Sequence, residues 1–180
     1  MSVKPGLVLW FTGLSGAGKT TTARALLEEL QKAGKAAELL DGDESRSVIS
    51  KGLGFSREDR LENIRRIIFI SKLLSRNGID VLVSAITPYR EMRDLARSES
   101  PEYVEIFVDC PLEECERRDV KGLYAKARNA EISHFTGIGD AYETPEQPDI
   151  VIRTDKEEVE SNVGHILDYM ARKGGRRSAV

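Results

Sequence analysis

The sequence holds few of the side chains on which several protein classes depend. It contains two cysteines, Cys110 and Cys115, which are too few for a disulfide framework or, on their own, for a metal site. The sequence has only two histidines, His134 and His165, so we do not expect histidine-based acid–base or metal chemistry. We therefore expect both thiols to stay reduced, as in a cytoplasmic protein, and other side chains to carry the chemistry.

Long apolar runs and an excess of basic residues are missing as well. No run approaches the roughly 18 apolar residues of a membrane span, and the N-terminus lacks a signal-peptide pattern. The formal net charge of −3 argues against a nucleic-acid-binding protein, which normally has a strong basic excess. We expect no membrane or nucleic-acid partner. At 40% hydrophobic and 32% charged residues, the 180-residue chain has the composition of one globular domain.

What the sequence does contain is a complete phosphate-binding motif. Gly13-Leu-Ser-Gly-Ala-Gly-Lys-Thr20 fits G-x-x-x-x-G-K-[ST] at every position, between an apolar run at 7–11 and a helix-forming segment that starts at Thr21. The glycines let backbone N–H groups surround an anion, and the helix N-terminus adds a positive dipole end. A glycine-rich turn that binds nothing would not require an apolar strand, the complete motif and a helix-forming segment in this order. The predicted ATP-binding residues are Gly13, Leu14, Ser15, Gly16, Ala17, Gly18, Lys19, Thr20 and Thr21.

Three side chains have predicted chemical roles around that motif. Lys19 supplies a charge to the β- and γ-phosphates and is a predicted catalytic residue, and the Thr20 hydroxyl is a predicted Mg²⁺ ligand. Asp41-Gly-Asp43 follows a strand predicted at 36–40, and ligands bind at the carboxyl ends of strands in open α/β sheets. No acidic residue ends the strand at 79–86, so either of these aspartates can serve as the carboxylate that binds Mg²⁺. Asp43 is our predicted catalytic residue and metal ligand. For either aspartate alone, a helix cap is the alternative.

Strand and helix patterns alternate along the whole chain. Strands are predicted at 7–11, 36–40, 79–86, 103–108 and 148–152, and helical segments lie between and after them. This alternation predicts an α/β protein with the three-layer P-loop NTPase fold, a mostly parallel sheet with helices on both faces. We expect one domain over 1–174 and a disordered tail at 175–180.

The pattern changes before the last strand. Between Arg117 and Arg128, five cations fall within twelve residues that have no long apolar stripe. A run of charges is usually a solvated face. A phosphoryl-transfer enzyme, however, needs a mobile segment that closes over its phosphates. We predict such a lid at about 117–131.

Taken together, these residues resemble the adenylylsulfate kinase (APS kinase) family of P-loop kinases. The phosphate loop alone is shared with thousands of proteins, but two other stretches are far more specific, Arg118-Asp-Val-Lys-Gly-Leu-Tyr124 and Phe135-Thr-Gly-Ile138. The remaining marks are Leu40-Asp-Gly-Asp43, Gly54-Phe-Ser56, Asp59-Arg-Leu-Glu-Asn-Ile-Arg-Arg66 and Thr87-Pro-Tyr-Arg90. The resemblance implies the sulfate-activation reaction, in which MgATP phosphorylates the ribose 3′-hydroxyl of adenylyl sulfate to give ADP and 3′-phosphoadenylyl sulfate.

The resemblance also implies an acceptor site. Phe55 and Phe135 would hold the adenine of adenylyl sulfate between two aromatic faces. Arg46, Arg60 and Asn63 would bind its phosphosulfate, together with Lys121 from the lid. The implied substrate-binding residues are Asp43, Arg46, Phe55, Arg60, Asn63, Ile86, Thr87, Lys121 and Phe135.

Two positions depart from the family pattern. Glu44 stands where the family commonly has asparagine, and Thr87 stands where it commonly has a serine that is often described as a phosphorylated intermediate. Thr87 is thus a possible phospho-acceptor position. No evident base adjoins it in the sequence, however, and an unassisted hydroxyl is a poor nucleophile. We predict direct transfer, with the Thr87 hydroxyl hydrogen-bonded to the substrate.

Two other functions stay open. The chain fits a P-loop kinase for another small acceptor, or a non-catalytic nucleotide-binding regulatory domain such as the one in fungal ATP sulfurylase. The second has no need of Lys19, Thr20 and Asp43, so their presence favours the enzyme. The resemblance further implies a homodimer, with ATP sulfurylase as a possible partner or fusion.

Overall fold

The computed structural model describes residues 3–100 and 102–177 of the chain. These residues form a sheet of five strands, β1 (Val8–Thr12), β2 (Ala37–Asp41), β3 (Asp80–Ser84), β4 (Tyr103–Val108) and β5 (Ile150–Ile152). The strand order is β2-β3-β1-β4-β5, and each neighbouring pair is parallel. β1 is therefore central, and the loop that follows it opens at the middle of the sheet's carboxyl edge.

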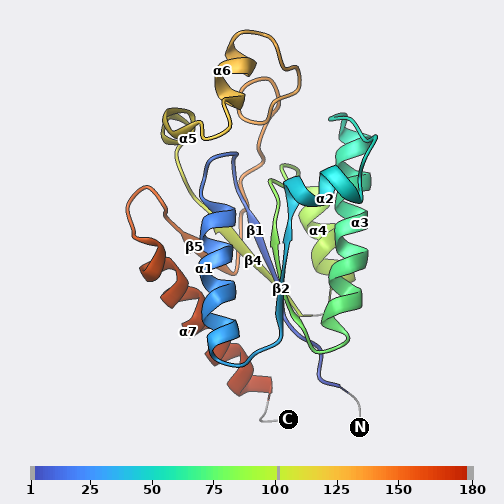
Figure 1. Cartoon of the computed structure of the whole chain (residues 1–180), viewed down its shortest axis with the longest axis vertical. Helices are drawn as coiled ribbons and strands as arrows, with labels where there is room; N and C mark the ends of the chain where they lie inside the picture. The colour runs from blue at the N-terminus through green and yellow to red at the C-terminus, as the bar shows by residue number, and fades with distance from the viewer. Residues whose placement is uncertain (1–2, 101, 178–180) are drawn as a thin grey trace.

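Helices cover both faces of this sheet (Figure 1). The helices α1 (Lys19–Lys32) and α7 (Val159–Arg177) lie on one face, and α3 (Arg57–Ser75) and α4 (Arg90–Glu99) lie on the other. The shorter helices α2 (Gly42–Val48), α5 (Leu112–Arg118) and α6 (Leu123–Arg128) gather beyond the carboxyl ends of the strands. The predicted α/β architecture with a parallel sheet and helices on both faces is confirmed.

Strand β1 shows why the chain builds two cores. Successive side chains of a strand point to opposite faces of the sheet. Leu9 and Phe11 pack into the cluster under α1 and α7, whereas Val8 and Trp10 pack into the cluster under α3 and α4. The side chains of this strand are buried on both faces, which explains its continuous apolar run.

Two helices differ from the sequence prediction, one in its existence and one in where it ends. Helix α2 was not predicted, because its seven residues, Gly-Asp-Glu-Ser-Arg-Ser-Val, have no apolar periodicity. Helix α7 continues to Arg177, so the tail does not begin at 175 as expected; its glycines cost only about 1 kcal/mol each in a helix. Residues 178–180 of the expected tail lie outside the described residues. Within the described part of the chain, no helix has the length and apolar character needed to cross a membrane.

Candidate active site

The loop between β1 and α1 has the backbone shape of an anion-binding loop. Gly16 and Gly18 have φ angles of 74° and 93°, in the left-handed region that favours glycine. Space is also restricted, since a Cβ on Gly16 would lie 3.0 Å from the carbonyl oxygen of Cys115. Gly18 is the N-cap of α1 and gives that helix no side-chain cap. The first N–H groups of α1 are thus free of a side-chain cap and suited to phosphate oxygens.

The Lys19 side chain folds back into this loop. Its Nζ donates hydrogen bonds to the carbonyl oxygens of Gly13, at 3.0 Å, and Leu14, at 2.7 Å. Burial lowers the pKa of Lys19 to about 8, against the weaker opposing effect of nearby acidic groups. A bound phosphate would favour the charged ammonium and raise that pKa again. The ammonium of Lys19 thus lies within the loop that the sequence predicts to bind phosphate.

The Thr20 hydroxyl lies among oxygen atoms at the ends of β2 and β3. Thr20 Oγ1 is 2.8 Å from Asp41 Oδ2 and 2.8 Å from Ser84 Oγ. Burial alone would raise the pKa of Asp41, but hydrogen bonds from Thr20 and from the backbone of α2 outweigh it and lower the pKa. Asp41 is thus both a helix cap and the carboxylate beside Thr20, where we had predicted Asp43.

This oxygen cluster fits Mg²⁺ by its chemistry. Mg²⁺ prefers oxygen ligands and commonly combines one or two protein groups with phosphate oxygens and water. Across residues 3–100 and 102–177, no group of three or more His, Cys, Asp or Glu side chains is arranged to hold a metal by itself. A magnesium ion here would therefore depend on the nucleotide for part of its coordination.

Asp43 faces the predicted lid instead. Its Oδ2 accepts a hydrogen bond from Lys121 Nζ, which joins α2 to the segment between α5 and α6. The side chains are 72% and 53% exposed, so solvent screens the pair and it adds little to stability. An anionic substrate entering between them would compete with Asp43 for Lys121.

A cavity of about 650 Å³ lies between the phosphate loop, the end of β3 and the segment that follows α5. This volume is in the range of small-molecule sites. Gly13, Leu14 and Ala17 are not part of its wall. The predicted residues that line it are Ser15, Gly16, Gly18, Lys19, Thr20, Thr21, Asp43, Arg46, Phe55, Arg60, Asn63, Ile86, Thr87, Lys121 and Phe135.

The two predicted adenine-binding rings differ in their surroundings. Phe55 is 54% exposed, and the guanidinium of Arg46 lies 4.6 Å from its ring centroid. Phe135 packs edge-on against Tyr124, with ring centroids 4.9 Å apart. Phe55 thus offers an open aromatic surface, and Phe135 offers a fixed one.

Arg60 holds the two ring-bearing segments together. Its Nε donates to the carbonyl oxygen of Phe55 at 2.9 Å, and its Nη1 donates to Thr136 Oγ1 at 2.9 Å. Its Nη2 contacts the carbonyl oxygen of His134. We had predicted Arg60 as an anion ligand, but here its guanidinium is buried and used by the protein.

Asn63 lies nearly one turn after Arg60 on α3 and is part of the cavity wall. Its side chain is buried, and its Oδ1 finds no hydrogen-bond partner among the described residues. An unpaired buried acceptor costs about 1–3 kcal/mol.

The comparisons with known proteins agree with this geometry. A family model described as adenylylsulphate kinase matches residues 5–153. The chain belongs to the adenylylsulphate kinase family. An adenylyl-sulfate kinase of Picosynechococcus sp. is 57% identical over 169 residues, which are 94% of this chain and 96% of that protein. Another, of Halothermothrix orenii, is 52% identical over 174 residues, or 97% and 94%.

A solved structure supports the family at the level of the fold. The structure of the Mycobacterium tuberculosis APS kinase in complex with AMPPNP and APS has a TM-score of 0.90 to this chain. The two are 43% identical, and the match covers 93% of this chain and 98% of that one. The predicted P-loop kinase fold, phosphotransferase class and adenylyl-sulfate kinase function are confirmed.

Within this adenylylsulphate kinase family member, the possible phospho-acceptor is enclosed. Thr87 is 2% exposed, and its Oγ1 accepts a hydrogen bond from Trp10 Nε1 at 2.9 Å while donating to the carbonyl oxygen of Ala85 at 3.3 Å. The hydroxyl is therefore directed into the protein, so the hydrogen bond to substrate that we expected of it is not what this structure favours. A hydroxyl held in this way is poorly placed for nucleophilic attack.

Sequence reasoning gave no role to some residues that support the site. Ser84 had no signal, because a serine at a strand end is common. Arg118 was counted among the lid cations, but its guanidinium donates to the carbonyl oxygens of Gly16 and Thr154, at 3.4 and 2.8 Å. Tyr124 Oη likewise donates to the Ser15 carbonyl oxygen at 2.8 Å. The segment predicted as a lid thus touches the phosphate loop directly.

Proposed function

We propose that this chain transfers the γ-phosphoryl group of ATP to the ribose 3′-hydroxyl of adenylyl sulfate. The observation that carries the proposal is the shared cavity, whose wall includes both the phosphate loop and the predicted acceptor residues Phe55, Asn63 and Phe135. A donor site and an aromatic-walled acceptor site in one cavity are what transfer between two bound nucleotides requires.

The proposed division of work follows the position of each group. Lys19 and the loop amides bind the β- and γ-phosphates. Thr20, together with Asp41 or Asp43, would hold Mg²⁺, which neutralises phosphate charge. Arg46 and Lys121, two cations of the cavity wall, would bind the acceptor's anionic groups. Asp43 orients the attacking hydroxyl. Phosphoryl transfer depends mainly on such positioning and charge stabilisation.

The direct test is ADP formation that depends on adenylyl sulfate. Purified protein with MgATP should release ADP at a rate that rises with added adenylyl sulfate, and 3′-phosphoadenylyl sulfate should accumulate in equal amount. Turnover with a different small acceptor would favour another kinase. Tight nucleotide binding without turnover would favour a regulatory domain. Omission of Mg²⁺ in the same assay tests the proposed metal.

The two rings should determine affinity for the acceptor. Replacing Phe55 or Phe135 with alanine removes a stacking surface worth about 1–3 kcal/mol per base, or roughly five- to 150-fold in binding. We expect the KM for adenylyl sulfate to rise in this range while the KM for ATP changes little. Steady-state kinetics with each substrate varied in turn measures both.

A matched control is Phe69→Ala, which removes an exposed phenylalanine from the outer side of α3. It should leave both KM values unchanged. An equal rise of both KM values in the Phe55 and Phe135 variants would show that these rings serve only the fold.

The segment 117–131 is proposed to close over the nucleotide. Its contacts with the phosphate loop come from Arg118 and Tyr124, and bound phosphates would add contacts to Lys121. Trypsin should therefore cut this segment in the free protein, and an ATP analogue with adenylyl sulfate should suppress the cuts. Mass spectrometry of the fragments locates them. Identical cleavage with and without ligands would indicate a rigid, solvated surface.

Three assignments concern the protein's surroundings. We propose a homodimer and a cytoplasmic location, the latter because ATP, the phosphoryl donor, is supplied there. ATP sulfurylase, the enzyme type that makes adenylyl sulfate, is the proposed partner or fusion. Light scattering after size exclusion tests the dimer, cell fractionation tests the location, and co-purification tests the partner.

A further inference from the structure

The turn at 86–88, which forms part of the cavity wall, is held from behind by strand β1. Thr87 has a φ angle of 49°, unusual for a β-branched residue, so its surroundings must hold it there. Trp10 and Thr12 supply two of the contacts. Trp10 Nε1 donates to Thr87 Oγ1 at 2.9 Å, and Thr12 Oγ1 donates to the Ile86 carbonyl oxygen at 2.7 Å.

The third contact comes from Arg93 of α4, whose guanidinium joins this turn to a distant part of the chain. Arg93 Nη1 donates to the carbonyl oxygen of Thr87 at 2.9 Å, and Nη2 donates to that of Glu143 at 2.6 Å. The side chain is 3% exposed, and its Nε lies 3.8 Å from Glu105. The planar fork of an arginine suits two acceptors at a fixed separation.

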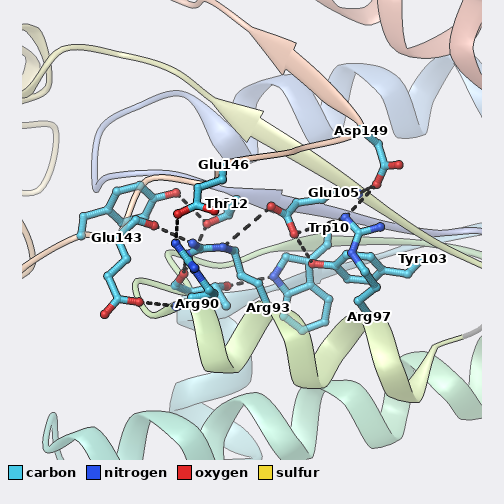
Figure 2. Close-up of polar contacts among 12 residues, drawn as sticks. Trp10, Thr12, Arg90, Arg93, Arg97, Tyr103, Glu105, Glu143, Glu146 and Asp149 are labelled. Atoms are coloured by element: carbon cyan, nitrogen blue, oxygen red, sulfur yellow. Dashed lines mark hydrogen bonds and ion pairs between the residues drawn. The ribbon is translucent and has the colours of Figure 1, made fainter.

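The segment that Arg93 reaches continues from the one that carries Phe135. Tyr142 Oη lies 2.8 Å from Thr12 Oγ1, and the backbone N–H of Glu143 donates to the Pro88 carbonyl oxygen at 2.8 Å. Figure 2 shows Thr12, Arg93 and Glu143 close together beside the first turns of α4. Two walls of the cavity, the turn at 86–88 and the segment with Phe135, thus share one buried anchor.

We infer that Arg93 is a positioning residue for the acceptor site: it fixes the turn at 86–88 against the Tyr142–Glu143 segment and so sets the spacing of the two walls. This inference rests on the proposed function. A purely structural role is the competing explanation, because Arg93 also lies near buried Glu105. Arg97 can distinguish the positioning role from the structural one, because it also contacts Glu105. It lies one turn further along α4, beside Tyr103, and pairs with Glu105 and Asp149 (Figure 2).

The test compares Arg93→Lys with Arg97→Lys. Both variants keep the positive charge and lose the fork, but only the first removes the double contact with Thr87 and Glu143. For Arg93→Lys we expect the KM for adenylyl sulfate to rise about ten- to 100-fold, while the KM for ATP stays within about twofold of the wild-type value. Arg97→Lys should leave both KM values within about twofold.

A second readout needs no substrate. Trp10 is the one tryptophan of the sequence, so its indole N–H gives a single signal in a ¹⁵N–¹H spectrum. Because that N–H donates to Thr87, a relaxed turn should move the signal in Arg93→Lys and leave it in place in Arg97→Lys. If Arg93→Lys fails to fold, Tyr142→Phe replaces it: this variant keeps the ring but loses the contact with Thr12, and it should raise the same KM selectively.

The outcomes separate the two proposals. A selective rise in the acceptor KM together with a moved indole signal supports the positioning role. Unchanged kinetics, an equal rise in both KM values, or an unmoved signal in the folded Arg93 variant would overturn it. A wild-type protein that forms no ADP in response to adenylyl sulfate would overturn the proposed function instead, and the indole signal would then decide whether Arg93 holds the turn.

Discussion

A Lys19→Ala variant is expected to fold normally and to lose almost all phosphoryl transfer. In the free protein Lys19 Nζ binds two carbonyl oxygens of the loop, so it lies where phosphate oxygens would replace them. Removing one preorganised charge-stabilising group typically lowers kcat by on the order of 10²–10³. ADP formation at saturating substrates measures the loss, and a thermal melt followed by circular dichroism checks the fold.

The matched control for Lys19→Ala is Lys32→Ala. Lys32 lies in the last turn of the same helix, α1, and pairs with Glu29 at the surface. Its removal takes away the same charge and should leave turnover unchanged. Near-normal turnover in folded Lys19→Ala would contradict the phosphate-binding role.

The pH dependence gives the same residue an independent readout. With the pKa of free Lys19 at about 8, the ammonium is charged below that pH and loses its proton as the pH rises past it. Phosphate binding favours the charged form, so the affinity for ATP should fall above pH 8, by up to about tenfold per pH unit. The Lys19→Ala variant should lack this fall. Nucleotide titrations between pH 7 and 9 measure it.

The phosphate loop and the sheet were predictable because their signals are local. The motif at 13–20 places its glycines, lysine and threonine by spacing alone, and the apolar run at 7–11 indicates a strand buried on both faces. Parallel pairing followed from the alternation of strands with helices. These features need no knowledge of contacts between distant segments.

The parts that the sequence did not predict depend on long-range contacts. Arg60 had the charge of an anion ligand, but its partners are Thr136 and the His134 carbonyl group, far along the chain. Arg93 had no signal for the same reason. Among the predicted lid cations, Arg117 pairs with Glu114, three residues away on the same helix, which sequence spacing suggests but does not decide. Arg128 pairs with Glu116 of the preceding helix, which spacing does not suggest.

Thr87 shows how backbone conformation changes a role assigned by residue type. In the sequence its hydroxyl was expected to meet the substrate. The left-handed φ angle of Thr87 accompanies a turn in which the hydroxyl points back to Trp10. Such a conformation is rare for threonine, and sequence patterns therefore do not predict it.

An Asp43→Asn variant is expected to lose most of kcat, whereas Thr87→Ala should keep it, because we propose direct transfer. The loose transition state of phosphoryl transfer requires orientation and charge stabilisation rather than a covalent intermediate. Asp43 lies in the cavity wall opposite Lys121, where its carboxylate can orient the attacking hydroxyl and accept its proton late in the reaction. A carboxylate in this role contributes on the order of 10²–10⁴ in rate.

Two further variants complete this test: a control at Glu44, beside Asp43 in the sequence, and a variant of the possible phospho-acceptor Thr87. Glu44→Gln removes the adjacent carboxylate of α2 and should keep kcat within about threefold, so a large loss is specific to Asp43. Thr87→Ala should also keep kcat within about threefold, since we propose that its enclosed hydroxyl takes no part in bond making. Its acceptor KM should rise, because Trp10 loses its partner on the turn. A folded Thr87→Ala enzyme without activity, together with ³²P-labelled Thr87 that chases into product, would establish a phospho-enzyme and refute direct transfer.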